Sequence, residues 1–230
     1  MRAVLIPVKE LSNAKQRLAP HFSIEERIAL ADALWQDFLE VMAGVRGIDR
    51  VFVVSSEARV LERAKQIGWE AIPECRQISE SDSVDFASLW CAERGVDALL
   101  RLPVDLPLVE PRDIEDIFEQ MPPAPGALLV PSQDGDGTNA LLRTPPALFP
   151  SHFGRGSFQR HLAEASRCGA QVRIVRNPRL ELDVDELDDL SVLSARRLRP
   201  TRTRVWLLAH GYDGVAQKAA GVGVLSRNPS

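Results

Sequence analysis

The sequence contains few cysteines and no long apolar run, and each absence excludes a class of protein. Its 230 residues include Cys75, Cys91 and Cys168, which lie far apart and form no Cys-x-x-Cys pair. A disulfide framework or a zinc site is therefore not expected, and a reducing cytoplasm is the expected compartment. No apolar run approaches the roughly 20 residues that span a bilayer, so no membrane partner is expected. The run after Met1 is too short for a secretory signal and predicts a first strand.

Several motifs of known nucleotide-binding and hydrolytic proteins are also missing. The chain has no Gly-x4-Gly-Lys-Ser/Thr P-loop, and the loop after the first predicted strand lacks the glycines of a dinucleotide-binding fingerprint. No Gly-x-Ser-x-Gly elbow occurs, and the histidines show neither metal-ligand nor dyad spacing. The sequence therefore does not support a mechanism with a side-chain nucleophile.

The composition is ordinary for a globular protein, with 45% apolar and 26% charged residues and a net charge of −4. Five arginines gather near the C-terminus, between Arg196 and Arg204. They lack the interleaved aromatic residues that stack on bases, so no nucleic-acid partner is expected. Residues 196–230 are predicted to form a basic, glycine-rich tail that is mobile from residue 211, with a candidate strand at residues 205–210.

Predicted strands and helices alternate along residues 1–195, which favours one α/β domain with a mostly parallel central sheet flanked by helices. The expected strands are residues 3–7, 50–54, 70–73, 98–102, 127–130, 139–143 and 171–175. The expected helices follow Ser23, whose capping box ends at Glu26, and cover residues 58–67, 84–94, 156–168 and 185–197, with another from Pro111. Right-handed crossovers would place the functional loops at the carboxyl ends of the strands.

Two glycine-rich loops indicate an anion site. The first is Pro131-Ser-Gln-Asp-Gly-Asp-Gly-Thr-Asn139, and the second is Phe153-Gly-Arg-Gly-Ser-Phe158, which opens a predicted helix at Ser157. Glycines let backbone N–H groups approach a ligand, and a helix N-terminus favours negative charge. Two such loops so close in the chain predict a pocket for a small phosphorylated molecule.

A basic loop and two acidic segments could complete a phosphate site. Lys9, Lys15 and Arg17 follow the first predicted strand, where they either neutralise a triphosphate or form a solvated loop. Asp105 lies between prolines at a strand end, where it either holds Mg²⁺ or serves as a helix N-cap or a turn residue. We favour the metal role, because Asp113 can cap the next helix.

The late segment Leu180-Glu-Leu-Asp-Val-Asp185 is the second acidic one. If it is extended, Glu181, Asp183 and Asp185 share one face, and one or two of them could join Asp105 as Mg²⁺ ligands. Asp185 could equally be the N-cap of the following helix, an alternative that is weaker for Asp183.

Five motifs occur in one order over roughly residues 1–195, and together they resemble the 2-phospholactate guanylyltransferase family of coenzyme F-420 biosynthesis. They are Pro7-Val-Lys9 with Ala14-Lys-x-Arg-Leu18, Pro103-x-Asp-Leu-Pro-Leu108, Gly137-Thr-Asn-Ala-Leu141, Phe153-Gly-x-Gly-Ser-Phe158 with His161, and Leu182-Asp-Val-Asp185. The resemblance implies a nucleotidyltransferase fold related to glycosyltransferase-A domains. It also implies a Mg²⁺-dependent transfer of GMP from GTP to 2-phospholactate, phosphoenolpyruvate or 3-phosphoglycerate, with release of pyrophosphate.

The resemblance also assigns expected site residues. Thr138, Gly154 and Ser157 match the acceptor-phosphate site. Asp105 matches a metal ligand, together with an acid of the Asp183–Asp185 pair. Lys9, Lys15 and Arg17 would face the GTP phosphates, and Lys15, Arg17 and Asp105 would be the catalytic residues.

Two departures keep alternatives open. Residues 81–88 replace a Gly-Leu-Asn-like helix start that the family places near the base or ribose, and Asp134 and Asp136 make the acceptor loop acidic. A cytidylyltransferase or molybdopterin guanylyltransferase is one alternative, although the chain lacks their Leu-x-Ala-Gly-Gly-like loop. A non-catalytic nucleotide-binding regulator is another. The sequence leaves the choice of acceptor and the possibility of a homo-oligomer open.

Overall fold

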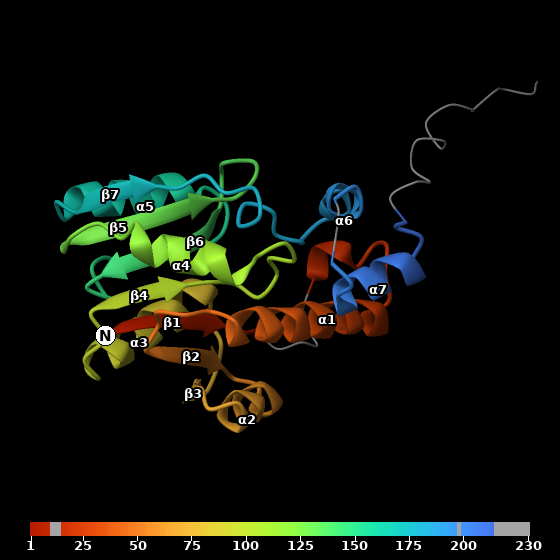
Figure 1. The fold of residues 1–230 in the computed structure, drawn as a ribbon, viewed down its shortest axis with the longest axis horizontal. Helices are drawn as coiled ribbons and strands as arrows, with labels where there is room; N and C mark the ends of the chain where they lie inside the picture. The colour runs from red at the N-terminus through yellow and green to blue at the C-terminus, as the bar shows by residue number, and fades with distance from the viewer. Residues whose placement is uncertain (10–14, 197–198, 214–230) are drawn as a thin grey trace, which may run out of the picture.

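A single mixed sheet organises the chain in the computed structural model, which describes residues 1–9, 15–196 and 199–213. Within these residues, seven strands pair in the order β3-β2-β1-β4-β6-β5-β7 (Figure 1). The strands are β1 (Arg2–Pro7), β2 (Arg50–Ser55), β3 (Glu70–Pro73), β4 (Ala98–Arg101), β5 (Gly126–Pro131), β6 (Thr138–Thr144) and β7 (Gln171–Ile174). The predicted α/β fold with a mostly parallel sheet is confirmed.

Strand β6 is the exception to the parallel pattern, because it runs antiparallel to both of its neighbours, β4 and β5. The segment 132–137 between β5 and β6 is too short for the crossover that parallel strands need, so the two strands form a hairpin. As a consequence, the carboxyl ends of β4 and β5 lie at the same edge of the sheet as the start of β6.

Helices cover both faces of the sheet because residues in the central strands alternate between two hydrophobic clusters. On β1, Val4 and Ile6 pack in a cluster with α1 and α4, whereas Ala3 and Leu5 pack against α3. The helices are η2 (Gln16–Leu18), α1 (Ile24–Ala43), α2 (Ala58–Gln66), α3 (Glu80–Ala92), α4 (Pro111–Glu119), α5 (Ser157–Arg167), α6 (Leu187–Ser194) and α7 (Arg202–Ala209). No helix among the described residues has both the length and the apolar character needed to cross a membrane.

Local signals in the sequence determine where several helices begin. Ser23 caps α1, and both hydrogen bonds of the predicted capping box with Glu26 are present. Helix α3 begins at Glu80, four residues before the expected start, because the Ser79 side chain accepts a hydrogen bond from the backbone N–H of Asp82. Residues 81–88 therefore belong to the first turns of a helix.

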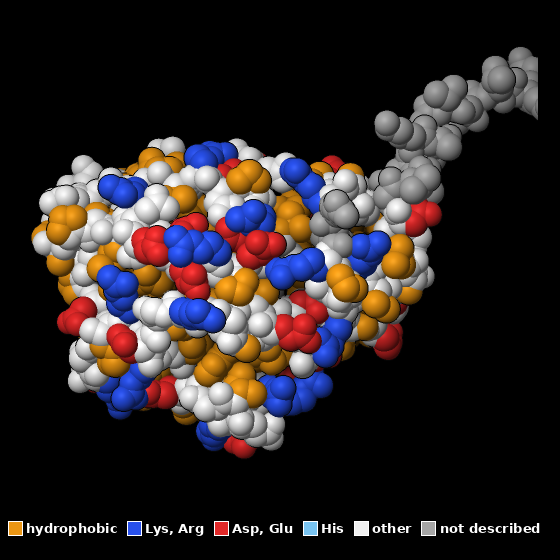
Figure 2. All heavy atoms as spheres, in the orientation of Figure 1, with side chains coloured by type: hydrophobic (Ala, Val, Ile, Leu, Met, Phe, Trp, Pro, Cys, Tyr) orange, Lys and Arg blue, Asp and Glu red, His pale blue; other side chains and the backbone are white. Residues whose placement is uncertain are grey.

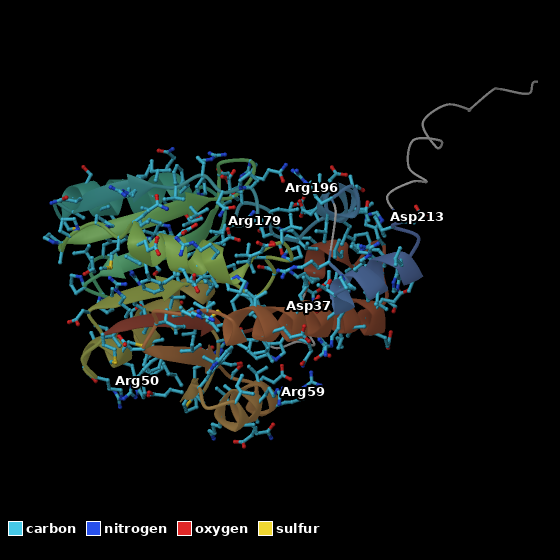
Figure 3. The ribbon with its side chains drawn as sticks, in the orientation of Figure 1. Asp37, Arg50, Arg59, Arg179, Arg196 and Asp213 are labelled. Atoms are coloured by element: carbon cyan, nitrogen blue, oxygen red, sulfur yellow. The ribbon has the colours of Figure 1, made fainter. Side chains whose placement is uncertain are left out.

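Helix α7 replaces the strand that the sequence predicts at residues 205–210, and that prediction is wrong. The buried Asp37 on α1 accepts hydrogen bonds from the backbone N–H groups of Arg202 (2.9 Å) and Thr203 (2.8 Å), so a side chain of another helix caps α7 (Figure 3). Trp206 and Leu207 then join a hydrophobic cluster with Leu18, whereas residues 214–230, where mobility was expected, lie outside the described residues.

Candidate active site

A cavity of about 940 Å³ lies where the carboxyl ends of β4 and β5 meet the start of β6. Its lining includes every residue expected in the site except Lys15, which lines a smaller adjoining cavity of about 300 Å³. Lys9, Arg17, Asp105 and Asp185 line both cavities. The structure therefore places the predicted phosphate and metal residues around one connected space.

The centre of this space is an ion cluster that joins three distant parts of the chain. The Lys15 ammonium nitrogen lies 2.6 Å from Asp105 Oδ2 and 3.1 Å from Asp185 Oδ1. Burial disfavours the charge of Lys15, but the two carboxylates outweigh that cost and raise the pKa of Lys15. The positive charge of Lys15 in turn lowers the pKa of Asp185 against the opposing effect of burial. Lys15 is therefore an ammonium ion between two carboxylates.

The backbone of Lys15 adopts a conformation that is rare for its residue type. Lys15 has φ 52° and ψ 43°, and no other described residue besides glycine has a positive φ. Left-handed backbone costs about 1 kcal/mol or more for a residue with a Cβ, and such strain concentrates at functional sites. The fully buried Leu18, one turn later, anchors this loop in the cluster that also contains Leu182 and Val184.

Asp183 supplies a third carboxylate, and Asn139 holds its segment in place. The Asn139 amide donates to the carbonyl oxygens of Leu180 and Glu181 and to Asp183 Oδ1, at 2.9–3.1 Å. Burial, together with the charges of Asp105 and Asp185, raises the pKa of Asp183 to about 6. The single charge of Lys15 therefore does not fully compensate the acids of this cluster.

The other late acids have structural partners. Glu181 pairs with Arg176 at 2.8 Å, outside the lining of the large cavity. Asp189, and not Asp185, supplies the capping carboxylate of α6, because its Oδ2 accepts from the backbone N–H groups of Asp185 and Glu186. Asp113 caps α4 as expected and also pairs with Arg179. The three predicted metal residues, Asp105, Asp183 and Asp185, all line the large cavity.

Three carboxylates of the cavity lining are of the donor type that a hard divalent cation takes. Among residues 1–9, 15–196 and 199–213, no group of three or more His, Cys, Asp or Glu side chains is arranged to hold a metal ion by itself. Mg²⁺ rarely uses an all-protein cage and instead takes one or two carboxylates, waters and substrate phosphate oxygens. The partly compensated carboxylates of Asp105, Asp183 and Asp185 match that requirement.

The two remaining cationic side chains of the site lie at its rim. Lys9 is exposed, and its ammonium lies 3.7 Å from Glu80 Oε2. Arg17 is exposed as well, 3.2 Å from Glu186 and 3.8 Å from Asp185. Both side chains are free to move toward an anion, because exposed ion pairs contribute at most about 1 kcal/mol.

The two glycine-rich loops meet at Thr138 and Ser157, which are both almost fully buried. The Ser157 hydroxyl lies 3.2 Å from Thr138 Oγ1, and His161 Nδ1 lies 3.0 Å from the same oxygen. Gly154 and Gly156 have φ values of 103° and 70°, which a side chain would strain. Gly154 lines the cavity, next to the N-terminus of α5.

The acidic residues of the first loop have defined contacts. Asp134 Oδ1 accepts from the Ser132 hydroxyl at 2.5 Å and from the Asp136 N–H at 2.9 Å, which closes the turn. Asp136 Oδ2 accepts from the Gly156 N–H at 2.8 Å, so a carboxylate of the chain itself lies at the N-terminus of α5. Asp134 therefore shapes the loop, whereas Asp136 faces the position expected for an anionic ligand.

Sequence reasoning gave no role to two polar residues at this site, Arg101 and His161. Arg101 is a buried cation at the end of β4 that pairs with Glu80 and stacks over the Phe153 ring, 4.1 Å from its centroid. Burial lowers the pKa of Arg101 to about 10, against the raising effects of Asp105 and Asp183. A single arginine at the end of an apolar strand is the signal that could have identified it. His161, one helical turn after Ser157, could have been found from that spacing.

Comparison with known proteins places this arrangement in a family. The family described as "Guanylyl transferase CofC like" matches residues 1–210. A phosphoenolpyruvate guanylyltransferase of Rubrobacter xylanophilus is 36% identical over 86% of this chain and 97% of its own length. A 2-phospho-L-lactate guanylyltransferase of Methanothermobacter thermautotrophicus is 32% identical over 81% of each chain. A 3-phospho-D-glycerate guanylyltransferase of Colwellia psychrerythraea is 29% identical over 83% of this chain and 90% of its own.

Solved structures support the fold. A Desulfovibrio desulfuricans protein described as a nucleotide-diphospho-sugar transferase superposes with a TM-score of 0.72 at 18% identity, covering 91% of this chain and 96% of its own. A cytidylyltransferase of Leptospira borgpetersenii superposes with a TM-score of 0.56 at 15% identity, covering 91% and 93%. At these identities the likeness concerns the fold alone.

Proposed function

Because the chain belongs to the CofC-like guanylyl transferase family, we propose that it transfers GMP from GTP to the phosphate of a small phospho-carboxylic acid and releases pyrophosphate. Phosphoenolpyruvate is the first acceptor to test, since the Rubrobacter relative bears that activity in its name, and 2-phospholactate and 3-phosphoglycerate follow. The family match favours guanylyl transfer over cytidylyl transfer, molybdopterin modification or a purely regulatory role.

The observation that carries this proposal is that two adjoining cavities with shared lining residues join an acid–ammonium cluster to a hydroxyl-lined helix start. The cluster of Lys15, Asp105 and Asp185 suits the triphosphate of a nucleotide. The Thr138–Ser157 pair beside the N-terminus of α5 suits a second, smaller phosphate. A reaction that joins two phosphates needs both kinds of site in one space.

In the proposed reaction, an ionised oxygen of the acceptor phosphate attacks the α-phosphorus of GTP. A new phosphorus–oxygen bond forms, the bond between the α-phosphorus and the bridging oxygen breaks, and that oxygen leaves with the pyrophosphate. Since the acceptor is already an anion, the protein supplies neither a nucleophile nor a general base. Its task is to align two phosphates that repel each other, which is catalysis by positioning and electrostatics.

Each group of residues then has one task. Thr138, Ser157 and the backbone near Gly154 orient the acceptor phosphate. Lys15 and Arg17 offset negative charge on the pyrophosphate as it leaves. When Mg²⁺ is bound, it supplies further neutralisation of phosphate charge, and Asp105 with Asp183 or Asp185 would hold it.

Turnover assays test this function. The protein is incubated with MgCl₂, each nucleoside triphosphate and each of the three acceptors, and the products are identified by mass spectrometry. We expect a guanosine diphosphate diester and one equivalent of pyrophosphate only when GTP and an acceptor are both present. Diester formation with CTP in place of GTP would contradict guanylyl transfer, and nucleotide binding without turnover would favour a regulator.

A further inference from the structure

His161 contacts the acceptor side of the cavity without lining it. It lies on α5, one turn after Ser157, and its side chain is fully buried. Both ring nitrogens have partners: Nε2 accepts from the backbone N–H of His152 at 2.8 Å, and Nδ1 lies 3.0 Å from Thr138 Oγ1. The ring also packs edge-on against Phe153, with centroids 5.0 Å apart. Contacts at both nitrogens and with the Phe153 ring therefore fix the orientation of the His161 ring.

These contacts define where the ring carries its proton. A backbone N–H can only donate, so Nε2 must present a lone pair to His152. The single proton of the neutral ring is then on Nδ1, which donates to Thr138 Oγ1. Burial, reinforced by the charges of Arg143, His152 and Arg101, lowers the pKa of His161 to about 3, in agreement with a neutral ring.

The donation from His161 limits what the Thr138 hydroxyl can do. Thr138 and Ser157 together have two hydroxyl protons, and their 3.2 Å contact uses one of them, whichever oxygen donates. Among the residues that the structure describes, no other protein group accepts a hydrogen bond from either hydroxyl. The second proton is thus available to a ligand, and both residues line the large cavity.

We propose that His161 is a positioning residue of the acceptor site: its ring, protonated on Nδ1, occupies a lone pair of Thr138 so that the Thr138–Ser157 pair donates a hydroxyl proton to the acceptor phosphate. The proposal rests on the proposed function for the identity of the anion, but its geometry concerns any phosphate at this place. Without His161, no donor fixes the rotation of the Thr138 hydroxyl. The pair then no longer holds a donor ready for the anion.

Two substitutions of similar size separate this role from a structural one. In His161→Asn, the amide nitrogen lies near the former Nδ1 and can still donate to Thr138. In His161→Gln, the amide lies near the former Nε2, so it can accept from His152 but leaves Thr138 without its donor. Loss of a hydrogen bond to a charged group is expected to weaken binding about tenfold or more.

We expect His161→Gln to raise the KM for the acceptor about tenfold or more, and to leave the KM for GTP unchanged. His161→Asn should stay within about threefold of the wild type, which corresponds to less than 1 kcal/mol. In the Thr138→Val background, His161→Gln should cause no further increase, because the hydroxyl that it orients is gone. Equal effects of the two His161 variants, or parallel changes in both KM values, would overturn the proposal.

Two measurements do not depend on turnover. Proton–nitrogen correlation spectra of the wild-type protein with ¹⁵N-labelled histidine should show His161 protonated on Nδ1, and a proton on Nε2 would contradict the proposal even if a variant failed to fold. Calorimetric titration with inorganic phosphate should show weaker binding to His161→Gln than to His161→Asn. If the wild-type protein shows no turnover but these results hold, the proposed reaction fails while the role of His161 stands.

Discussion

Lys15 Nζ and Asp105 Oδ2 lie 2.6 Å apart although 90 positions separate the two residues in the chain. The backbone of Asp105 makes a second long-range contact, because its carbonyl oxygen accepts a hydrogen bond from the backbone N–H of Val184 at 3.1 Å. The loop after β1, the loop after β4 and the late acidic segment therefore meet at Asp105. A change at this residue should affect all three.

Asp105→Asn should reduce guanylyl transfer by ~10²-fold or more, the usual cost of losing one electrostatic contact to reacting phosphates. The amide keeps the shape of the side chain but neither binds Mg²⁺ well nor balances Lys15. Initial rates at saturating GTP and acceptor measure the effect. Asp116→Asn, on α4 and outside the lining of both cavities, is the matched control and should keep its activity. A near-normal rate for Asp105→Asn would exclude the metal assignment.

Lys15→Met should destabilise the metal-free protein by about 2 kcal/mol. Removal of one partner of a fully buried ion pair costs about 3–5 kcal/mol, and Asp185, which is 40% exposed, reduces that value. Because the acids then lack a counter-charge, millimolar MgCl₂ should stabilise the variant more than the wild type. Urea unfolding with and without MgCl₂ measures both effects. The same response to MgCl₂ in both proteins would show that these acids do not attract the cation.

Asp136→Asn should lower the KM for the acceptor roughly fivefold. The amide oxygen can still accept from the Gly156 N–H, but the negative charge beside the anionic acceptor is removed, which is worth about 1 kcal/mol near a wet surface. Asp134→Asn is the control, because Asp134 closes the turn and should affect mainly stability. Steady-state kinetics with each acceptor would also show whether Asp136 decides the choice among them.

Cys91 should be inert in the native protein. Burial raises the pKa of its thiol to about 12, so almost no thiolate exists at pH 8, whereas Cys75 and Cys168 are exposed. A thiol reagent at pH 8 should label those two quickly and Cys91 only after denaturation. Since the raised pKa favours the protonated thiol in the folded state, this contribution to stability is present below the unfolded value and is lost as the pH rises toward 12. Rapid labelling of Cys91 in the native protein would contradict its burial.

Asp37→Ala should destabilise the protein by about 2 kcal/mol, because two backbone N–H groups of α7 lose their acceptor. Asp37→Asn, which keeps an acceptor oxygen, should cost less. Asp32→Ala, on the same helix, controls for the substitution itself. Thermal unfolding measures the order, and equal melting temperatures for Asp37→Ala and Asp32→Ala would show that the cap contributes nothing.

Local signals in the sequence predicted most of the fold. Periodicity located the strands and most helices, and Ser23 with Glu26 predicted the start of α1, because these signals act within a few residues. The strand predicted at residues 205–210 failed for the opposite reason. The partner that caps α7 is Asp37, 165 positions earlier, and no local pattern contains it.

The site was predictable in its parts but not in its contacts. The sequence predicted that Asp105 would face the same space as an acid of the pair Asp183–Asp185, and the structure places them so. It predicted Lys15 for the triphosphate, yet in the structure Lys15 is bound to those acids. It left His161 without a role: the spacing from Ser157 indicates a shared helix face, but the contact with Thr138, 23 residues earlier, shows only in the structure. The functional roles of all the predicted site residues stay predictions. Figure 2 shows acidic and basic side chains interspersed across one face of the molecule.

The position of the capped helix α7 near the end of the chain affects the order in which parts of the protein fold during synthesis. Leu18 and Val184, which support the Lys15 loop and the acidic segment, share their hydrophobic cluster with Trp206, whose indole N–H donates to the carbonyl oxygen of Glu26. On a ribosome, Glu26 is made 180 residues before Trp206. Contacts between such distant positions form late because their loop closure costs the most entropy. The nascent chain can build its sheet first, whereas the two halves of the ion cluster gain their full support only after residues 202–209 have emerged.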